Sequence, residues 1–70
     1  MMAGTPMQSW CIRCQYEGKK PFLFGTLVIE RSTSFDDREK AMIALLHEHL
    51  AMRPAIIGWM PGALIFHEAG

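Results

Sequence analysis

The segment that most constrains the fold is residues 22–30, which read FLFGTLVIE. In an extended strand, successive side chains point to opposite faces of the sheet. One face of this strand then carries three large apolar side chains: Phe22, Phe24 and Val28. The other face does the same with three more: Leu23, Leu27 and Ile29. A strand that is apolar on both faces needs cover on both sides. Gly25, in its middle, predicts a bulge or a point of close packing.

A single helix is available to supply that cover. Ser34 followed by Asp37 is a weaker form of the capping box and predicts the helix start, with Thr33 and Asp36 as the alternative register. Pro54 predicts its end near Met52. Apolar spacing at i, i+3, i+4, i+7 and i+8 predicts a core-facing stripe: Met42, Leu45, Leu46, His49 and Leu50. One stripe covers one face of a sheet, so the other face lacks a helix.

The remaining segments complete a small α+β domain. Residues 7–16 alternate between apolar and polar and predict a strand, joined by the polar turn at 17–21 to residues 22–30 in an antiparallel hairpin. Residues 63–67 predict a returning strand, and residues 55–59 form either a fourth strand or a crossing loop. The expected fold is β-β-α-β, an antiparallel sheet with one helix on one face.

We expect one domain over residues 7–70, preceded by a flexible tail at 1–6. A chain of 70 residues builds only a marginal core. Leaving the second face in water forgoes about 1.5–3 kcal/mol for each large apolar side chain. The sequence therefore predicts a homodimer or a partner protein that covers this surface, through a sheet face or an edge strand. The predicted interface residues are Phe22, Phe24, Val28, Trp10 and Trp59.

Composition narrows the class of function. Seven basic and seven acidic residues give a formal net charge of zero, which argues against a dedicated nucleic-acid binder and against attachment to anionic membranes. The sequence has no apolar run long enough for a membrane helix and no signal peptide, so we expect a cytoplasmic protein with reduced thiols.

Two motifs raise the question of metal binding or catalysis. Cys11 and Cys14 form a C-x2-C pair, but residues three apart on a strand point to opposite faces. His47 and His49 lack the i, i+4 spacing that lets two histidines reach one ion. We expect no metal, no cofactor and no enzymatic activity; a zinc-stabilised domain is the third alternative.

The alternative from a different class is a small nucleic-acid-binding protein. Trp10, Tyr16 and Phe24 are candidates for stacking on bases. Basic residues close to the hairpin are the candidate phosphate contacts: Arg13, Lys19, Lys20 and Arg31. The favoured prediction is a non-enzymatic protein-interaction module, a small accessory or regulatory protein of the kind found in phages and mobile elements.

Overall fold

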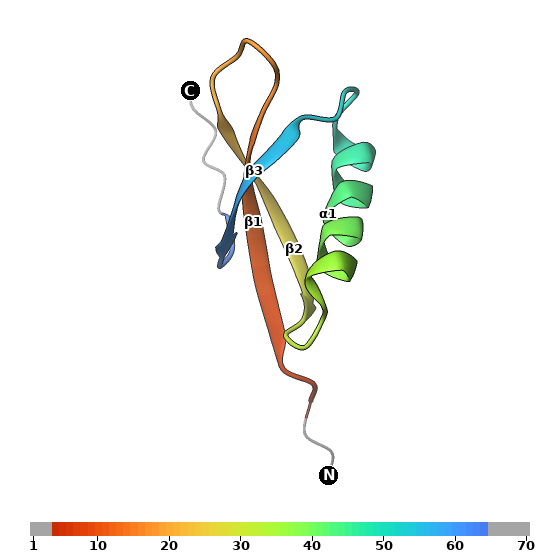
Figure 1. The fold of residues 1–70 in the computed structure, drawn as a ribbon. Coiled ribbons are helices and arrows are strands. Elements are labelled where there is room, and N and C mark those ends of the chain that lie inside the picture. The colour runs from red at the N-terminus through yellow and green to blue at the C-terminus, as the bar shows by residue number, and fades with distance from the viewer. Residues whose placement is uncertain (1–3, 65–70) are drawn as a thin grey trace.

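The computed structural model describes residues 4–64, which form three strands and one helix. These are β1 (Met7–Gln15), β2 (Phe22–Glu30), α1 (Phe35–His49) and β3 (Ala55–Pro61) (Figure 1). The strands make one antiparallel sheet in the order β2-β1-β3, and the helix lies on one of its faces. The predicted α+β fold and the predicted hairpin of β1 and β2 are confirmed.

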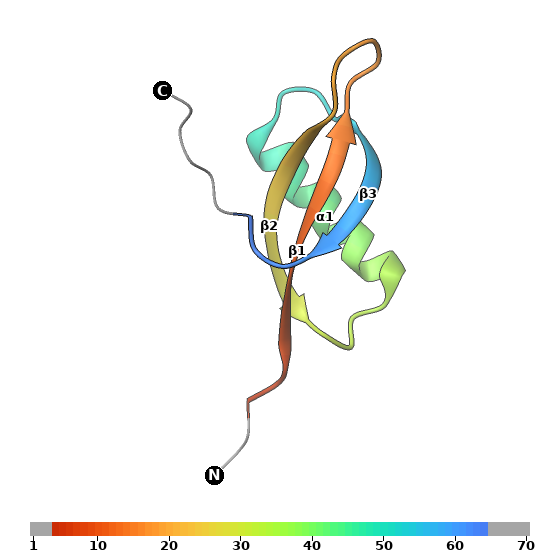
Figure 2. The same ribbon diagram turned by 90° about the vertical axis from the view of Figure 1, so that its left-hand side faces the viewer.

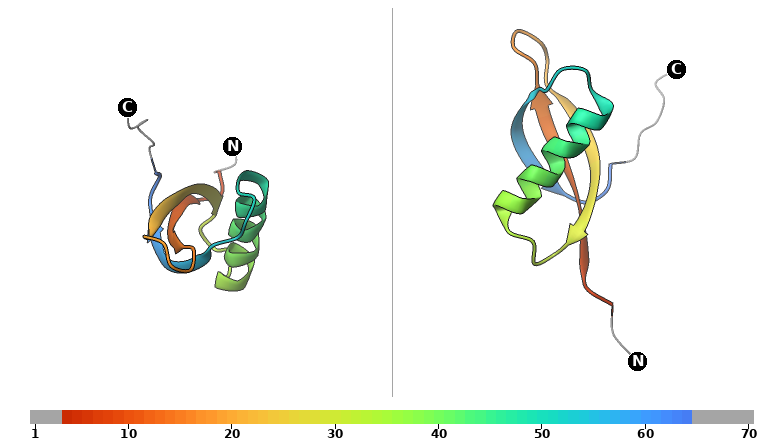
Figure 3. Two further views of the ribbon diagram at one scale, coloured as in Figure 1. Left: turned by 90° about the horizontal axis from the view of Figure 1, so that it is seen from above. Right: turned by 90° about the vertical axis from the view of Figure 1, so that its right-hand side faces the viewer.

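The sheet has β1 at its centre and an edge strand on each side. The chain crosses from the β2 edge to the β3 edge through α1, which runs obliquely across the sheet with its first turn on the β3 side (Figure 3). Strand β2, which the sequence presents as needing cover on both faces, is thus an edge strand. Of the predicted tail, residues 1–3 lie outside the described residues, and the Pro6 carbonyl accepts a hydrogen bond from the Arg31 N–H at 2.9 Å.

The returning strand lies earlier in the sequence than predicted. The third strand is β3, at the segment left open between a strand and a loop, whereas Ala63 and Leu64 are not in a strand. Residues 65–67 of the predicted strand lie outside the described residues. The physical reason is the turn at Pro61 and Gly62. Gly62 has a φ of 115°, a conformation that suits glycine. The chain therefore leaves the sheet at this turn, whereas we expected the last strand to begin after it.

The helix begins as its capping signal predicts. The Asp37 N–H donates to Ser34 Oγ at 3.2 Å, which satisfies one of the free N–H groups of the first turn. The helix ends at His49, and the Leu50 N–H closes it by donating to the Leu46 carbonyl at 2.8 Å. The end lies three residues before the predicted one, because the chain turns extended at Leu50, well ahead of Pro54.

A bulge in β2 decides which side chains face the helix. Trp10 pairs with Leu27 while Cys11 pairs with Gly25, so Thr26 is an extra residue on β2 and reverses the alternation. On either side of it, Phe24 and Leu27 therefore face the same way, toward the helix. The prediction that Phe22, Phe24 and Val28 share one face is wrong, because the bulge turns Val28 outward.

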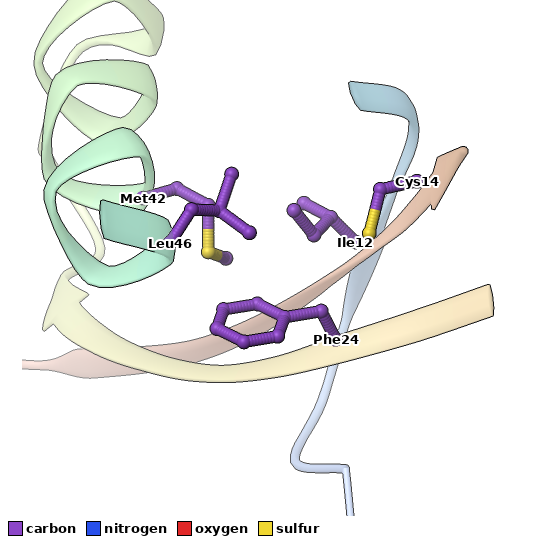
Figure 4. Close-up of a cluster of buried hydrophobic side chains, with 5 residues drawn as sticks. All are labelled: Ile12, Cys14, Phe24, Met42 and Leu46. Carbon is purple, nitrogen blue, oxygen red and sulfur yellow. The ribbon is translucent and has the colours of Figure 1, made fainter. Parts of the chain in front are cut away.

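The core fills the space between the helix and the sheet. Five buried side chains from β1, β2 and α1 form it: Ile12, Cys14, Phe24, Met42 and Leu46 (Figure 4). Figure 4 shows Met42 and Leu46 reaching from the helix toward Ile12 and Phe24 on the sheet. Burial of each large apolar side chain is worth about 1.5–3 kcal/mol, so this cluster holds the helix to the sheet.

The face of the sheet opposite the helix, here called the outer face, is partly covered by the chain itself. After β3 the backbone crosses this face over β1 toward β2 (Figure 2). The Gly62 N–H donates to the Ser9 carbonyl at 2.8 Å, and the Leu64 N–H donates to Thr26 Oγ1 at 2.9 Å. Cys11, on the outer face, is buried as a result. Three large apolar residues that point outward stay exposed: Met7, Leu23 and Val28. The crossing segment divides them, so the continuous apolar face expected from the sequence does not form.

Gly25 allows β1 and β2 to approach closely at the bulge. A Cβ atom at this position would lie 2.7 Å from Cys11 Cβ, closer than carbon atoms pack. We predict that Gly25→Ala lowers the free energy of unfolding by about 1–3 kcal/mol. Gly58→Ala is the matched control, because its Cβ would lie at an ordinary 3.6 Å from Arg13 Cβ. Urea denaturation followed by circular dichroism measures both, and equal stability of the two variants would contradict the close approach.

Candidate functional site

Four side chains from three elements meet where the first turn of α1 lies against the sheet. They form what we call the aromatic–arginine cluster: Trp10 of β1, Phe35 and Arg38 of α1, and Trp59 of β3. Trp10 and Trp59 both pack against the core on the helix side. Phe35 and Arg38 are three residues apart on the helix, a spacing that places two side chains on the same face. The fold thus brings together residues that are far apart in the sequence, since Trp10 and Trp59 are separated by 49 positions.

The guanidinium of Arg38 is surrounded by aromatic rings. Its Cζ atom lies 3.8 Å from the centre of the Trp10 ring, 4.7 Å from Trp59 and 5.0 Å from Phe35. The rings also contact one another edge to face: Trp10 and Trp59 at 6.1 Å and 83°, Phe35 and Trp59 at 5.8 Å and 68°. All three ring centres lie within the roughly 6 Å over which a cation is attracted to an aromatic face.

Within residues 4–64 the guanidinium of Arg38 has no carboxylate or other hydrogen-bond partner. Its Nε atom is buried and forms no hydrogen bond. The two terminal nitrogens also make no hydrogen bond to a described residue, so they are able to donate. Half of the Phe35 surface is also exposed. The cluster therefore presents an apolar rim beside a positive charge whose donors are unused.

The five predicted interface residues separate into different parts of the molecule. Trp10 and Trp59 come together in the cluster, whereas Phe24 is buried in the core. Phe22 stacks on Tyr16 with ring centres 5.6 Å apart. Val28 is exposed on the outer face. Sequence reasoning missed Phe35 and Arg38; their spacing of three residues, at the start of an amphipathic helix, is the signal that places them on one face.

The basic residues named for nucleic-acid binding do not form one patch. Lys19 and Lys20 lie in the turn between β1 and β2, and Arg31 follows the far end of β2. A strand of this length separates them by about 30 Å. Arg13 is exposed in the middle of β1 on the outer face. Tyr16, a candidate for base stacking, has its hydroxyl donating to the Met52 carbonyl at 2.7 Å.

The two cysteines lie on opposite faces of β1, as their spacing predicts. Cys14 belongs to the core on the helix side, and burial raises the pKa of its thiol. Cys11 lies on the outer face, 3.8 Å from the Met60 carbonyl. Both are free thiols. In the described part of the chain no three histidine, cysteine or acidic side chains lie together as a metal site would require.

A hollow lies between the β1–β2 turn and the loop that follows α1. It has a volume of about 660 Å³, and Tyr16, Lys19, Met52 and Arg53 are among its lining residues. The Tyr16 hydroxyl is already engaged with the Met52 carbonyl. A ligand pocket usually needs several polar groups that converge on one point. This hollow offers separate charged side chains around an apolar floor, so the aromatic–arginine cluster is the better candidate.

Comparison with protein-family models, curated proteins and solved structures finds no match to this chain. Between residues 4 and 64, the helix is too short and too polar to cross a membrane.

The cluster predicts a contribution of Arg38 to stability. Arg38→Ala removes a cation held by three rings and the apolar stem that packs on them, so we expect a loss of about 1–2 kcal/mol in the free energy of unfolding. Lys40→Ala is the control, an exposed cation on the same helix, and should change stability by less than about 0.5 kcal/mol. Thermal and urea denaturation measure both. If the two variants lose the same amount, the rings do not hold Arg38 in solution.

Proposed function

We propose that this chain is a non-enzymatic protein-interaction module that docks on a partner protein through the aromatic–arginine cluster. The observation that carries the proposal is that Arg38, held among three rings, has no acidic partner in residues 4–64. Tryptophan and arginine are the residue types most enriched among those that dominate binding energy at protein interfaces. The cluster combines two tryptophans and an arginine with the half-exposed ring of Phe35.

The non-enzymatic part of the proposal is supported by the titratable groups. Catalytic groups usually have a pKa shifted toward their task and lie in a cleft. Among the described residues the pKa of Cys14 is shifted, and this thiol is buried in the hydrophobic core, where no substrate reaches it. The proposed setting is the one expected from the sequence, a small cytoplasmic accessory or regulatory protein of the kind found in phages and mobile elements.

We further propose that the module forms a homodimer through the free edge of β2. An edge strand presents a row of unpaired backbone groups that can pair with another copy. The β2 edge is nine residues long and carries two exposed apolar side chains, Leu23 and Val28. Strand β3 is shorter and ends in Pro61. Because the cluster lies on the β3 side of the sheet, pairing through β2 leaves it open for a partner (Figure 3).

Docking through the cluster predicts that Phe35→Asp abolishes partner binding. The substitution removes the exposed ring on which a partner would pack, and the new carboxylate would lie beside Arg38 and compete for its guanidinium. Met52→Asp is the control, because Met52 is also an exposed apolar residue but lies beyond the other end of the helix. Each immobilised variant is incubated with lysate of the source cells, and retained proteins are quantified by mass spectrometry. We expect a protein retained by the native chain and by Met52→Asp but depleted about tenfold or more by Phe35→Asp. Equal retention by both variants would contradict the proposed surface.

Pairing through β2 predicts a concentration-dependent dimer. Light scattering at high concentration should give twice the mass of the chain, and Val28→Lys should return it to the monomer by placing a charge beside the edge. Ile57→Lys, an equally exposed apolar position on β3, should leave the dimer intact. A monomer at all concentrations would exclude self-association, and dissociation by Ile57→Lys alone would move the interface to β3.

A further inference from the structure

We infer that Arg38 is a receptor for a carboxylate of the partner protein, with the surrounding rings holding its guanidinium in place. This inference rests on the proposed function and adds the chemistry of the ligand. The planar guanidinium presents its donors as a fork that matches the two oxygens of a carboxylate. A free arginine side chain loses much rotational freedom when it binds. Here Trp10, Trp59 and Phe35 already confine it within 3.8–5.0 Å of their ring centres.

The hydrogen-bond donors of Arg38 that lack an acceptor indicate which group the site would bind. The buried Nε atom has no acceptor, and the terminal nitrogens make no hydrogen bond to a described residue. The chain has acidic residues close by in sequence, Asp36, Asp37 and Glu39, yet none of them forms an ion pair with Arg38. The two aspartates are exposed in the first turn of the helix. An incoming carboxylate is therefore free to supply the acceptor that the chain does not.

The surroundings favour a single carboxylate over a nucleic-acid backbone. Asp36, Asp37 and Glu39 give this end of the helix a local excess of negative charge, which repels a strand carrying a phosphate at every residue. A protein segment brings one carboxylate among neutral and apolar neighbours. Its apolar side chains can pack on the exposed half of Phe35. The partner chemistry is thus an acidic side chain or a C-terminal carboxylate next to an apolar residue.

The test compares two probes that differ in one charge. N-acetyl-leucine carries an apolar side chain and a free carboxylate, and N-acetyl-leucinamide carries the same side chain with a neutral amide. Each is titrated into the full chain at constant ionic strength, and the indole N–H signals are followed by NMR. The chain contains two tryptophans, Trp10 and Trp59, and both belong to the cluster, so both signals report on the site. We expect saturable shifts with the acid and about tenfold weaker binding of the amide, the usual effect of losing one charge-assisted hydrogen-bonded pair.

Substitution of Arg38 separates charge from geometry. Arg38→Lys keeps the positive charge but removes the fork, and should weaken binding of N-acetyl-leucine about tenfold. Arg53→Lys makes the same change at an exposed arginine outside the cluster and should leave the affinity unchanged. Circular dichroism of both variants verifies that they fold.

Three outcomes would overturn the inference: equal binding of the acid and the amide, no shift with either, or tighter binding of an eight-residue oligothymidylate than of the acid. The first would leave the docking surface in place, because the capture experiment with Phe35→Asp also tests the loss of the exposed Phe35 ring, which a partner without a carboxylate would still contact. The third would assign the site to nucleic acid. Failure of the capture experiment alone, with a tenfold preference for the acid, would show a carboxylate site that serves a function other than docking.

Discussion

The structure depends on one extra residue in β2. Without the bulge at Thr26, the regular alternation of β2 would send Phe24 and Leu27 to opposite faces, and the helix would cover only one of them. With it, both side chains face α1, and the two-sided strand becomes one that a single helix can largely cover. The bulge in turn needs Gly25, because any side chain there would collide with Cys11 across the strand pair. The bulge at Gly25 and Thr26 therefore sets the register of β2 against β1. The register determines which side chains enter the core, and so allows one helix to cover the sheet.

The same geometry positions the candidate site. The chain leaves β2 at one edge, crosses the sheet as α1 and returns as β3 at the other edge, so the first turn of the helix lies over the β3 side (Figure 3). Trp59 meets that turn from β3, and Trp10 meets it from the neighbouring strand β1. The core holds the last turns of the helix through Leu46, and the aromatic–arginine cluster holds the first turn. A surface suited to binding is thus also the second attachment of the helix to the sheet.

The sequence predicts what local rules decide and misses what depends on contacts between distant residues. The helix start follows from the short-range preference of Ser34 for the Asp37 N–H, and the hairpin follows from alternation on either side of a polar turn. The faces of β2 depend instead on a close approach between Gly25 and Cys11, which no pattern within β2 reveals. For the third strand, Ala55–Pro61 and residues 63–67 are both apolar, and pairing with β1 selects the former. Trp10 and Trp59 could be named from residue type, but their meeting with Arg38 requires the crossover.

Arg38 is the residue at which the local rules and the structure disagree most. Arg38 lies three residues after Phe35, the first residue of the helix. This position is close to the positive end of the helix dipole, where acidic residues are favoured and a cation is disfavoured. Its Nε atom is buried without an acceptor, which adds a desolvation penalty. Glutamine carries no charge, and lysine has a carbon where arginine has Nε, so each would cover the rings with its stem and avoid one of these penalties. Natural sequences break local rules mainly where function requires it. The attraction of the three rings offsets part of the penalty, and in the complex that we propose a carboxylate of the partner would offset the rest.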